Sequence, residues 1–168
     1  GERSFKNCSQ LSKVTLPSSV NEIGSESFEG CGQLTRINLP SSITIIGDKS
    51  FKNCSKLSKI IFPSSLNKIG SESFEGCSQL KAIHFPSSIT TIGERSFKDC
   101  SQLSKIILSS SLIKIGSKSF EGCSPKIDID GNIQRLPNNL FEGFSQLKAI
   151  TFYSSITIIG DKTFKDCS

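Results

Sequence analysis

The chain has 168 residues, of which 35% are hydrophobic, and carries a formal net charge of +5. This length suffices for one domain with its own core, and the mild positive charge permits an anionic partner without requiring one. No apolar run in the sequence approaches the roughly 18 to 20 residues of a membrane-spanning helix.

The dominant feature is an internal repeat of 23 residues, a period typical of stacked arrays. We therefore expect a single leucine-rich-repeat-like solenoid over residues 1–168. Because the chain opens and closes within a repeat and has no polar capping unit, we expect it to be a slice of a longer protein. The repeats start at Cys8, Cys31, Cys54, Cys77, Cys100, Cys123 and Phe144.

The first half of the third repeat predicts a short strand. Ile60 and Phe62 are two residues apart and should point inward. Lys59 and Ile61 should then point outward, because successive side chains of a strand alternate between its faces. Pro63 ends the strand, since it has no N–H to donate.

The second half predicts a shorter extended piece and a turn. Residues 66–69 have apolar ends that should face inward, and Gly70 can take a positive φ where the chain turns. Ser71 can cap a single helical or 3₁₀ turn that brings Phe74 and Cys77 inward.

These elements define the expected fold class. We predict an α/β-type solenoid dominated by parallel β structure, a right-handed stack of about seven coils of 23 residues. The longer strands should line the concave face, with the short extended pieces and the helical or 3₁₀ turns opposite. The sixth repeat, residues 123–143, is shorter and has 21 residues.

The recurring frame C-x-x-L-x-x-I-x-L/F-P-S-S-I/L-x-x-I-G-x-x-S-F resembles the BspA-like, or TpLRR, class of leucine-rich repeats. The resemblance covers essentially the whole chain. It implies a solenoid found in cell-surface and secreted proteins of bacteria and protozoa, often adhesins that bind host matrix or other cells. A cytoplasmic location stays open.

The seven cysteines are interpreted as buried, reduced thiols that act as small hydrophobic groups. They have no C-x-x-C spacing, and the lone His84 cannot complete a tetrahedral metal site. An occasional bridge between adjacent coils stays open. We expect no metal, no cofactor and no catalytic constellation, and hence a protein that is not an enzyme.

Charge alternates along the stack at the residue after the core phenylalanine. We expect these opposite charges to face each other on neighbouring coils and to help set the register. Glu142 breaks the alternation, which predicts the weakest joint at the irregular repeat. The alternating residues are Lys6, Glu29, Lys52, Glu75, Lys98 and Glu121.

The outward face of the longer strands is the candidate binding surface. Ile61, His84 and Ile107 fall on consecutive coils at a position that is otherwise polar, and exposed apolar groups set among charges mark interaction surfaces. Two isoleucines that merely raise strand propensity are the alternative explanation. The predicted partner-binding residues are Lys59, Ile61, His84, Lys105, Ile107, Asp128 and Tyr153.

Three functions stay open at this point. The first is a protein-binding module of a cell-surface or secreted adhesin, and the second is an intracellular scaffold. The third is a binder of polyanions such as sulfated glycans, without nucleic acid because no aromatic residues interleave with the cations. Uncapped ends would also allow end-to-end self-association. The basic column for a polyanion is Lys13, Arg36, Lys59, Lys105 and Lys126.

Overall fold

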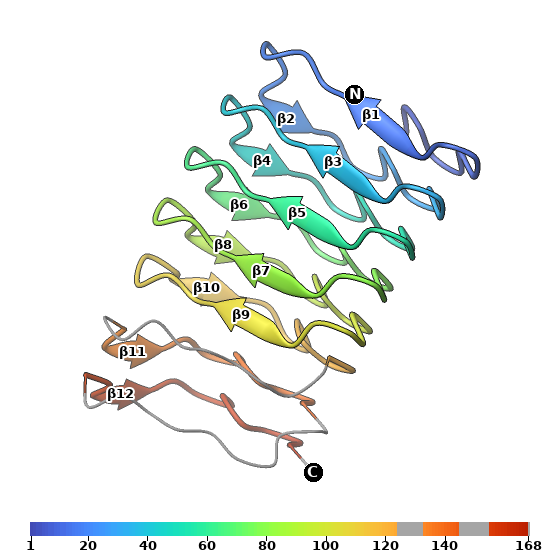
Figure 1. Cartoon of the computed structure of the whole chain (residues 1–168). Coiled ribbons are helices and arrows are strands. Elements are labelled where there is room, and N and C mark those ends of the chain that lie inside the picture. Colours follow the sequence, from blue (N-terminus) through green and yellow to red (C-terminus); the bar gives the residue numbers. More distant parts are fainter. Residues whose placement is uncertain (124–132, 145–154, 168) are drawn as a thin grey trace.

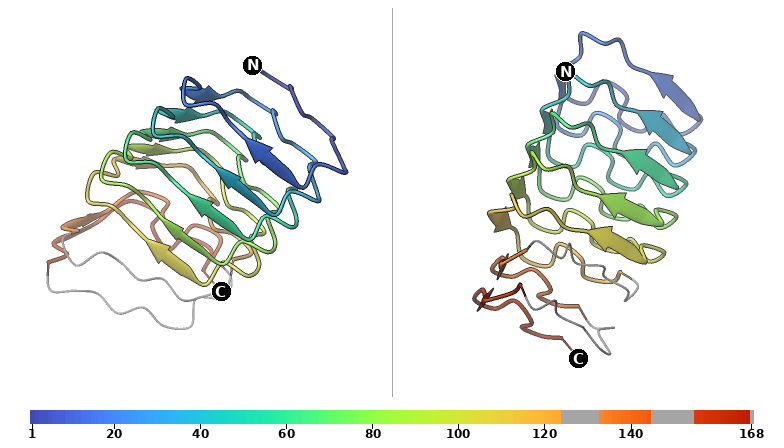
Figure 2. Two further views of the ribbon diagram at one scale, coloured as in Figure 1. Left: turned by 45° about the horizontal axis from the view of Figure 1, so that its top comes forward. Right: turned by 60° about the vertical axis from the view of Figure 1, so that its left-hand side comes forward.

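The computed structural model describes residues 1–123, 133–144 and 155–167. In these ranges the chain winds into a stack of coils that carries two rows of short parallel strands, one on each side (Figures 1 and 2). The three-residue strands of one row are β1 (Lys13–Thr15), β3 (Arg36–Asn38), β5 (Lys59–Ile61), β7 (Ala82–His84) and β9 (Lys105–Ile107).

The opposite row consists of two-residue strands. From β1 to β10 the strands of the two rows alternate along the chain, so each of these coils contributes one strand to either side. This confirms the predicted solenoid of parallel β structure. The short strands are β2 (Glu22–Ile23), β4 (Ile45–Ile46), β6 (Lys68–Ile69), β8 (Thr91–Ile92), β10 (Lys114–Ile115), β11 (Arg135–Leu136) and β12 (Ile158–Ile159).

The register follows the repeat. Arg36 pairs with Lys59, its equivalent on the next coil, and Ile37 pairs with Ile60. Identical positions therefore stack in columns, and each apolar column becomes a continuous strip of core. The row of longer strands divides into β1-β3-β5 and β7-β9, and the short row divides into β10-β8-β6-β4-β2 and β11-β12.

The core is a column of phenylalanine rings between the two rows. The ring centroids of Phe51 and Phe74 lie 5.2 Å apart, and those of Phe74 and Phe97 lie 5.1 Å apart, in stacked orientation. Beside them the thiol of Cys77 donates to the backbone carbonyl of Phe51, at 3.2 Å. A coil cannot bury these groups alone, so stacking is what stabilises the fold.

The expected helical or 3₁₀ turn is wrong for the described residues, which contain successive β-turns instead. Glu72 and Gly76 adopt positive φ angles of 55° and 73°, which interrupt a right-handed helix. The N–H groups of Glu72 and Phe74 donate to the carbonyls of Glu94 and Ser96 on the next coil. Hydrogen bonds between coils thus replace those within a helix. No helix in the described ranges is long and apolar enough to cross a membrane.

Candidate binding surface

The predicted surface on the longer strands is hollowed. A cavity of about 680 Å³ opens over β5, β7 and β9. It brings together the predicted residues Lys59, Ile61, His84, Lys105 and Ile107, which all line it. The other two predicted residues, at positions 128 and 153, lie outside the described residues, as does position 126 of the basic column.

The hollow lies where the row of longer strands divides. β7 pairs with β9 in register, placing Ala82 beside Lys105 and His84 beside Ile107. β5 instead belongs to the sheet of β1 and β3, although Cα atoms of β5 and β7 come within 8 Å of each other. The repeat pattern alone does not predict this interruption between β5 and β7, which the coordinates show.

Strand alternation sets which side chains reach the hollow. Ile60 is buried at 6% exposure, whereas Ile61, the next residue, is 65% exposed. On β9, Ile106 is buried and Ile107 is half-buried. Two aliphatic side chains therefore stand on the outer face of the sheet, where water would otherwise favour polar groups.

The hollow owes its depth to a residue that sequence reasoning passed over. Ala82 occupies the column that holds Lys59 on the preceding coil and Lys105 on the following coil. A methyl group there fills far less space than a lysine side chain, so a depression forms between the two cations. The signal was present in the sequence, as a single small residue in a basic column.

The lining of the hollow is rich in lysine. Lys59, Lys81 and Lys105 all line it, and none of the described lining residues is acidic. Lys81 was likewise not predicted. Cations around an aliphatic floor can bind a partner that presents carboxylate or sulfate groups together with apolar surface.

The cysteines form no site. All seven are free, and Cys31, Cys54, Cys77, Cys100 and Cys123 are buried as expected. Cys8 is exposed, which corrects the expectation that every cysteine is buried; no coil of the structure covers its outer side. Burial raises the pKa of the Cys54 thiol to about 12. Among the described residues, no three His, Cys, Asp or Glu side chains cluster as metal ligands.

The alternating charges form ion pairs between neighbouring coils, and each of the two lysines described next has a second acidic partner that was not predicted. The Lys52 ammonium lies 3.3 Å from Glu75, as the alternation predicts, and closer, at 2.6 Å, to Glu72 three residues earlier. Lys6 repeats the arrangement with Glu29 at 3.1 Å and Glu26 at 2.6 Å. The second acidic partner is a correction to the simple ladder of single pairs.

Short parallel strands stacked at a fixed period, with an exposed strand face, define a repeat scaffold of the leucine-rich-repeat class. The family model described as "BspA type Leucine rich repeat region" matches residues 1–100 and 68–168, in six copies. The chain belongs to this family. The leucine-rich-repeat fold generally serves as a scaffold for protein interactions, and the comparisons indicate no enzymatic family.

Solved structures agree with this assignment. A leucine-rich repeat protein from T. pallidum, TpLRR, is 30% identical over 89% of this chain and 69% of its own, with a TM-score of 0.70. One from Bacteroides ovatus, at 22% identity, shows the fold alone; the match covers 99% of this chain and 67% of that protein, with a TM-score of 0.60.

A third structure is that of a leucine rich cell surface protein from Faecalibacterium prausnitzii. It is 24% identical, covers 98% of this chain and 54% of its own, and has a TM-score of 0.51, so it too shows the fold alone. No curated protein matches the chain.

Proposed function

We propose that the chain is a non-enzymatic protein-binding module of a cell-surface or secreted, adhesin-like protein. Its partner docks on the longer strands, over the hollow around Ala82. The surface location is inferred from the family resemblance, and one structural relative is itself described as a cell surface protein. Host-matrix or cell-surface proteins are the partners that this resemblance implies.

One observation carries the choice of surface. Ile61 is 65% exposed on a strand whose inner residue is fully engaged in the core, and it stands beside a hollow rimmed by lysines. Aliphatic groups that contribute nothing to the core and sit among charges contribute to binding when a partner removes them from water. Asp128 and Tyr153 remain proposed contacts of the partner.

The test is binding to a panel of purified extracellular-matrix proteins, measured by biolayer interferometry. For any partner that binds, the double variant Ile61→Ala/Ile107→Ala should weaken the affinity by about tenfold or more, because truncating buried interface anchors typically costs above 1 kcal/mol each. The melting temperature should stay nearly unchanged, since at least Ile61 lies outside the core.

A matched control is Ile158→Ala. Ile158 is 48% exposed on β12, in the opposite row of strands, and does not line this hollow. It should leave the affinity unchanged. If the double variant and this control behave alike, the hollow is not the docking surface.

A second candidate is binding of a sulfated glycan, favoured by the three lysines that line the hollow. Its signature is a steep loss of affinity with salt, because binding releases counterions in proportion to the charged contacts. Heparin affinity is therefore measured between 50 and 300 mM NaCl, roughly the range over which such losses span orders of magnitude. The salt dependence distinguishes a glycan ligand from a protein partner. A flat response removes the glycan.

A further inference from the structure

The row of short strands opens at one joint. β10 ends the five-stranded sheet, and β11 begins a separate pair with β12. No Cα atom of β10 lies within 8 Å of a Cα atom of β11, whereas all other successive short strands approach within that distance. Paired strands lie about 4.8 Å apart, and strands separated by one neighbour about twice that. The separation therefore excludes direct pairing of β10 and β11 and leaves the facing edges of both strands unpaired in this row.

The sequence of the irregular repeat explains the opening. In the regular coils the glycine after the short strand donates its N–H to the preceding coil, as Gly116 does to the carbonyl of Ile92 at 2.9 Å. Pro137 occupies that place and has no N–H. Leu140 and Phe144 replace the buried serine and cysteine, whose side chains bond to the preceding coil elsewhere in the stack.

Both edges of the opening have backbone carbonyl or N–H groups that pair with a neighbouring strand elsewhere in the stack. In the regular stack the carbonyl of Thr90 accepts from the N–H of Ile113, at 3.0 Å. The equivalent carbonyls of Ile113 and Ile115 accept from no described residue of the following coil. The N–H groups of Gln134 and Arg135 likewise donate to no described residue of the preceding coil. Unpaired strand edges are templates for an added strand.

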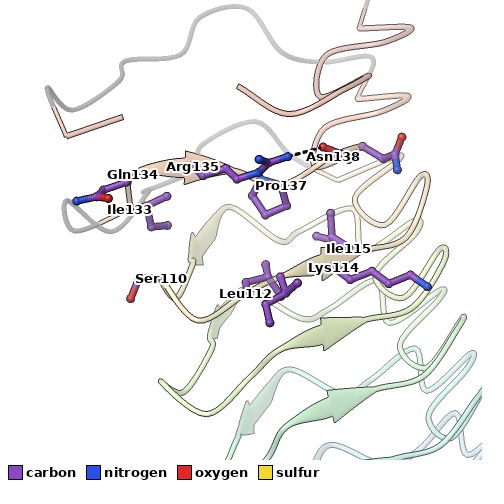
Figure 3. A pocket seen from close by; sticks show the side chains of 11 residues that line it. Ser110, Leu112, Lys114, Ile115, Ile133, Gln134, Arg135, Pro137 and Asn138 are labelled. Atoms are coloured by element: carbon purple, nitrogen blue, oxygen red, sulfur yellow. Dashed lines mark hydrogen bonds between the residues drawn. The ribbon is translucent and has the colours of Figure 1, made fainter. Parts of the chain in front are cut away.

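The space between the edges is a cleft of about 780 Å³ (Figure 3). Ile113, at one rim, is 80% exposed. Lys114 and Arg135 are exposed on the outer side, whereas Ile115 and Leu136, their neighbours in sequence, are buried on the inner side. None of the described lining residues is acidic. Arg135 contacts the amide oxygen of Asn138 at 3.3 Å, which leaves further guanidinium donors for a ligand.

We propose that this cleft binds an extended peptide of a partner protein, which inserts as a parallel strand between β10 and β11. The peptide carries an acidic residue followed by an aliphatic one. The carboxylate lies on the outer side between Lys114 and Arg135, and the aliphatic side chain points inward beside Ile115, which lines the cleft. The peptide backbone donates to the carbonyls of β10 and accepts from the N–H groups at the start of β11.

This site is independent of the hollow on the longer strands, because it lies in the opposite row. The chain itself shows that the proposed peptide pattern suits such a strand. In β2, Glu22 is exposed and Ile23 is buried at 3% exposure, paired in parallel with β4. The backbone pattern required of the peptide is the one that each regular coil already makes with its neighbours.

The chain also supplies two matched probes. Residues 19–26 read Ser-Val-Asn-Glu-Ile-Gly-Ser-Glu, and residues 65–72 read Ser-Leu-Asn-Lys-Ile-Gly-Ser-Glu. The two stretches differ only in Val against Leu and in Glu against Lys. Fluorescein-labelled synthetic peptides of both sequences are titrated with the protein, and binding is followed by anisotropy. The glutamate peptide should bind about tenfold or more tightly than the lysine peptide, the size of effect that a charge pair and a charge repulsion together produce.

Protein variants locate the binding. Two single variants, Arg135→Glu and Lys114→Glu, are tested separately. Each should lower the affinity for the glutamate peptide and raise that for the lysine peptide, because a negative charge replaces a positive one on the outer side of the cleft. Lys68→Glu makes the same change of net charge on β6, away from this cleft, and should leave both affinities as they are. Ile61→Ala/Ile107→Ala should also bind the glutamate peptide normally. Circular dichroism confirms that each variant is folded.

Hydrogen exchange provides the backbone readout. Binding of the glutamate peptide should slow exchange of the amides of Gln134 and Arg135, which gain an acceptor. Equal affinity of the two peptides, no binding of either at millimolar concentration, or identical behaviour of Arg135→Glu and Lys68→Glu would each overturn the proposal. Unchanged exchange at Gln134 and Arg135 in the bound state would overturn the strand insertion.

Discussion

The side-chain amide oxygen of Asn53 fills the space beside Gly76, the residue in the same place on the next coil. A Cβ atom at residue 76 would lie 2.5 Å from that oxygen. Both residues have positive φ angles, of 60° and 73°, a conformation that Asn and Gly tolerate best. Asp99 and Gly122 repeat the relationship. From Asn7 to Gly122, coils with a side chain here therefore alternate with coils without one, which gives this part of the stack a two-coil period.

Gly76→Ala is the first prediction. The left-handed backbone alone costs a residue with a Cβ about 1–2 kcal/mol, and the contact with Asn53 adds to this loss. Urea unfolding should therefore show a clear decrease in the free energy of unfolding. Gly32→Ala is the control, because a Cβ there meets nothing nearer than the Ser55 hydroxyl at 3.6 Å. Equal stability of the two variants would contradict the steric role of Asn53.

The buried serines form a second stabilising column. The Ser73 hydroxyl lies 2.7 Å from the carbonyl oxygen of Gly70 and 3.0 Å from that of Gly47 on the preceding coil. Ser73→Ala removes one hydroxyl donor from this column, although the carbonyls of Gly47 and Gly70 also lie near the hydroxyls of Ser50 and Ser96. The variant should lose about 0.5–1.5 kcal/mol, the net contribution of a typical hydrogen bond. Thermal and urea unfolding measure the loss.

Ser73→Thr is the matched control for this column. In the last described coil Thr163 occupies the same place, and its hydroxyl lies 2.6 Å from the carbonyl oxygen of Gly160 and 3.1 Å from that of Pro137. The threonine variant should retain most of the stability. A loss as large as that of Ser73→Ala would show that side-chain volume, rather than the hydroxyl, decides the effect.

Thiol reactivity should divide the cysteines by burial. Exposed Cys8 should react rapidly with Ellman's reagent at pH 8, because the thiolate is the reactive form and is accessible there. Burial raises the pKa of Cys54 to about 12 and that of Cys77 well above its ordinary value, so these thiols should react only after unfolding. Cys8→Ser should remove the fastest reaction and leave only the slower reaction of the partly buried Cys167. Rapid reaction of several thiols in the folded protein would refute the buried column.

Acid stability should depend on Glu26. Its carboxylate accepts hydrogen bonds from Arg3 at 2.9 Å and from Lys6 at 2.6 Å, which lower its pKa from 4.5 to about 2. A lowered pKa in the folded state means that the ionised form stabilises the fold above pH 4.5. This contribution is lost as the pH falls from 4.5 towards 2.

The corresponding variant is Glu26→Gln. Its melting temperature should lie below that of the wild type at pH 6 and approach it at pH 2, with a smaller difference in high salt. Glu22→Gln, at an exposed position of β2, should follow the wild type across the range. A constant difference between Glu26→Gln and wild type at all pH values would exclude the ionic origin.

The sequence predicted the strand faces because they depend on a local rule. Side chains alternate along an extended backbone, so Ile60 and Phe62 had to be buried once Lys59 faced water, and they are 6% and 8% exposed. The same rule placed Ile61 outside and led to the candidate surface. The predicted helical turn was wrong because the turn residues bond to the next coil, a contact that local propensity does not contain.

The repeat by itself determined the solenoid, its parallel register and its columns of Phe and Cys, since equal spacing puts equivalent residues side by side once one coil cannot bury its own core. Only the tertiary structure decided where the two rows of strands part, between β5 and β7 and between β10 and β11. Each of these openings depends on how two neighbouring coils fit against each other. The second opening coincides with the irregular repeat, where Pro137 lacks the N–H that pairs regular coils. The first lies between two regular repeats, and only the fit of the stacked coils decides it.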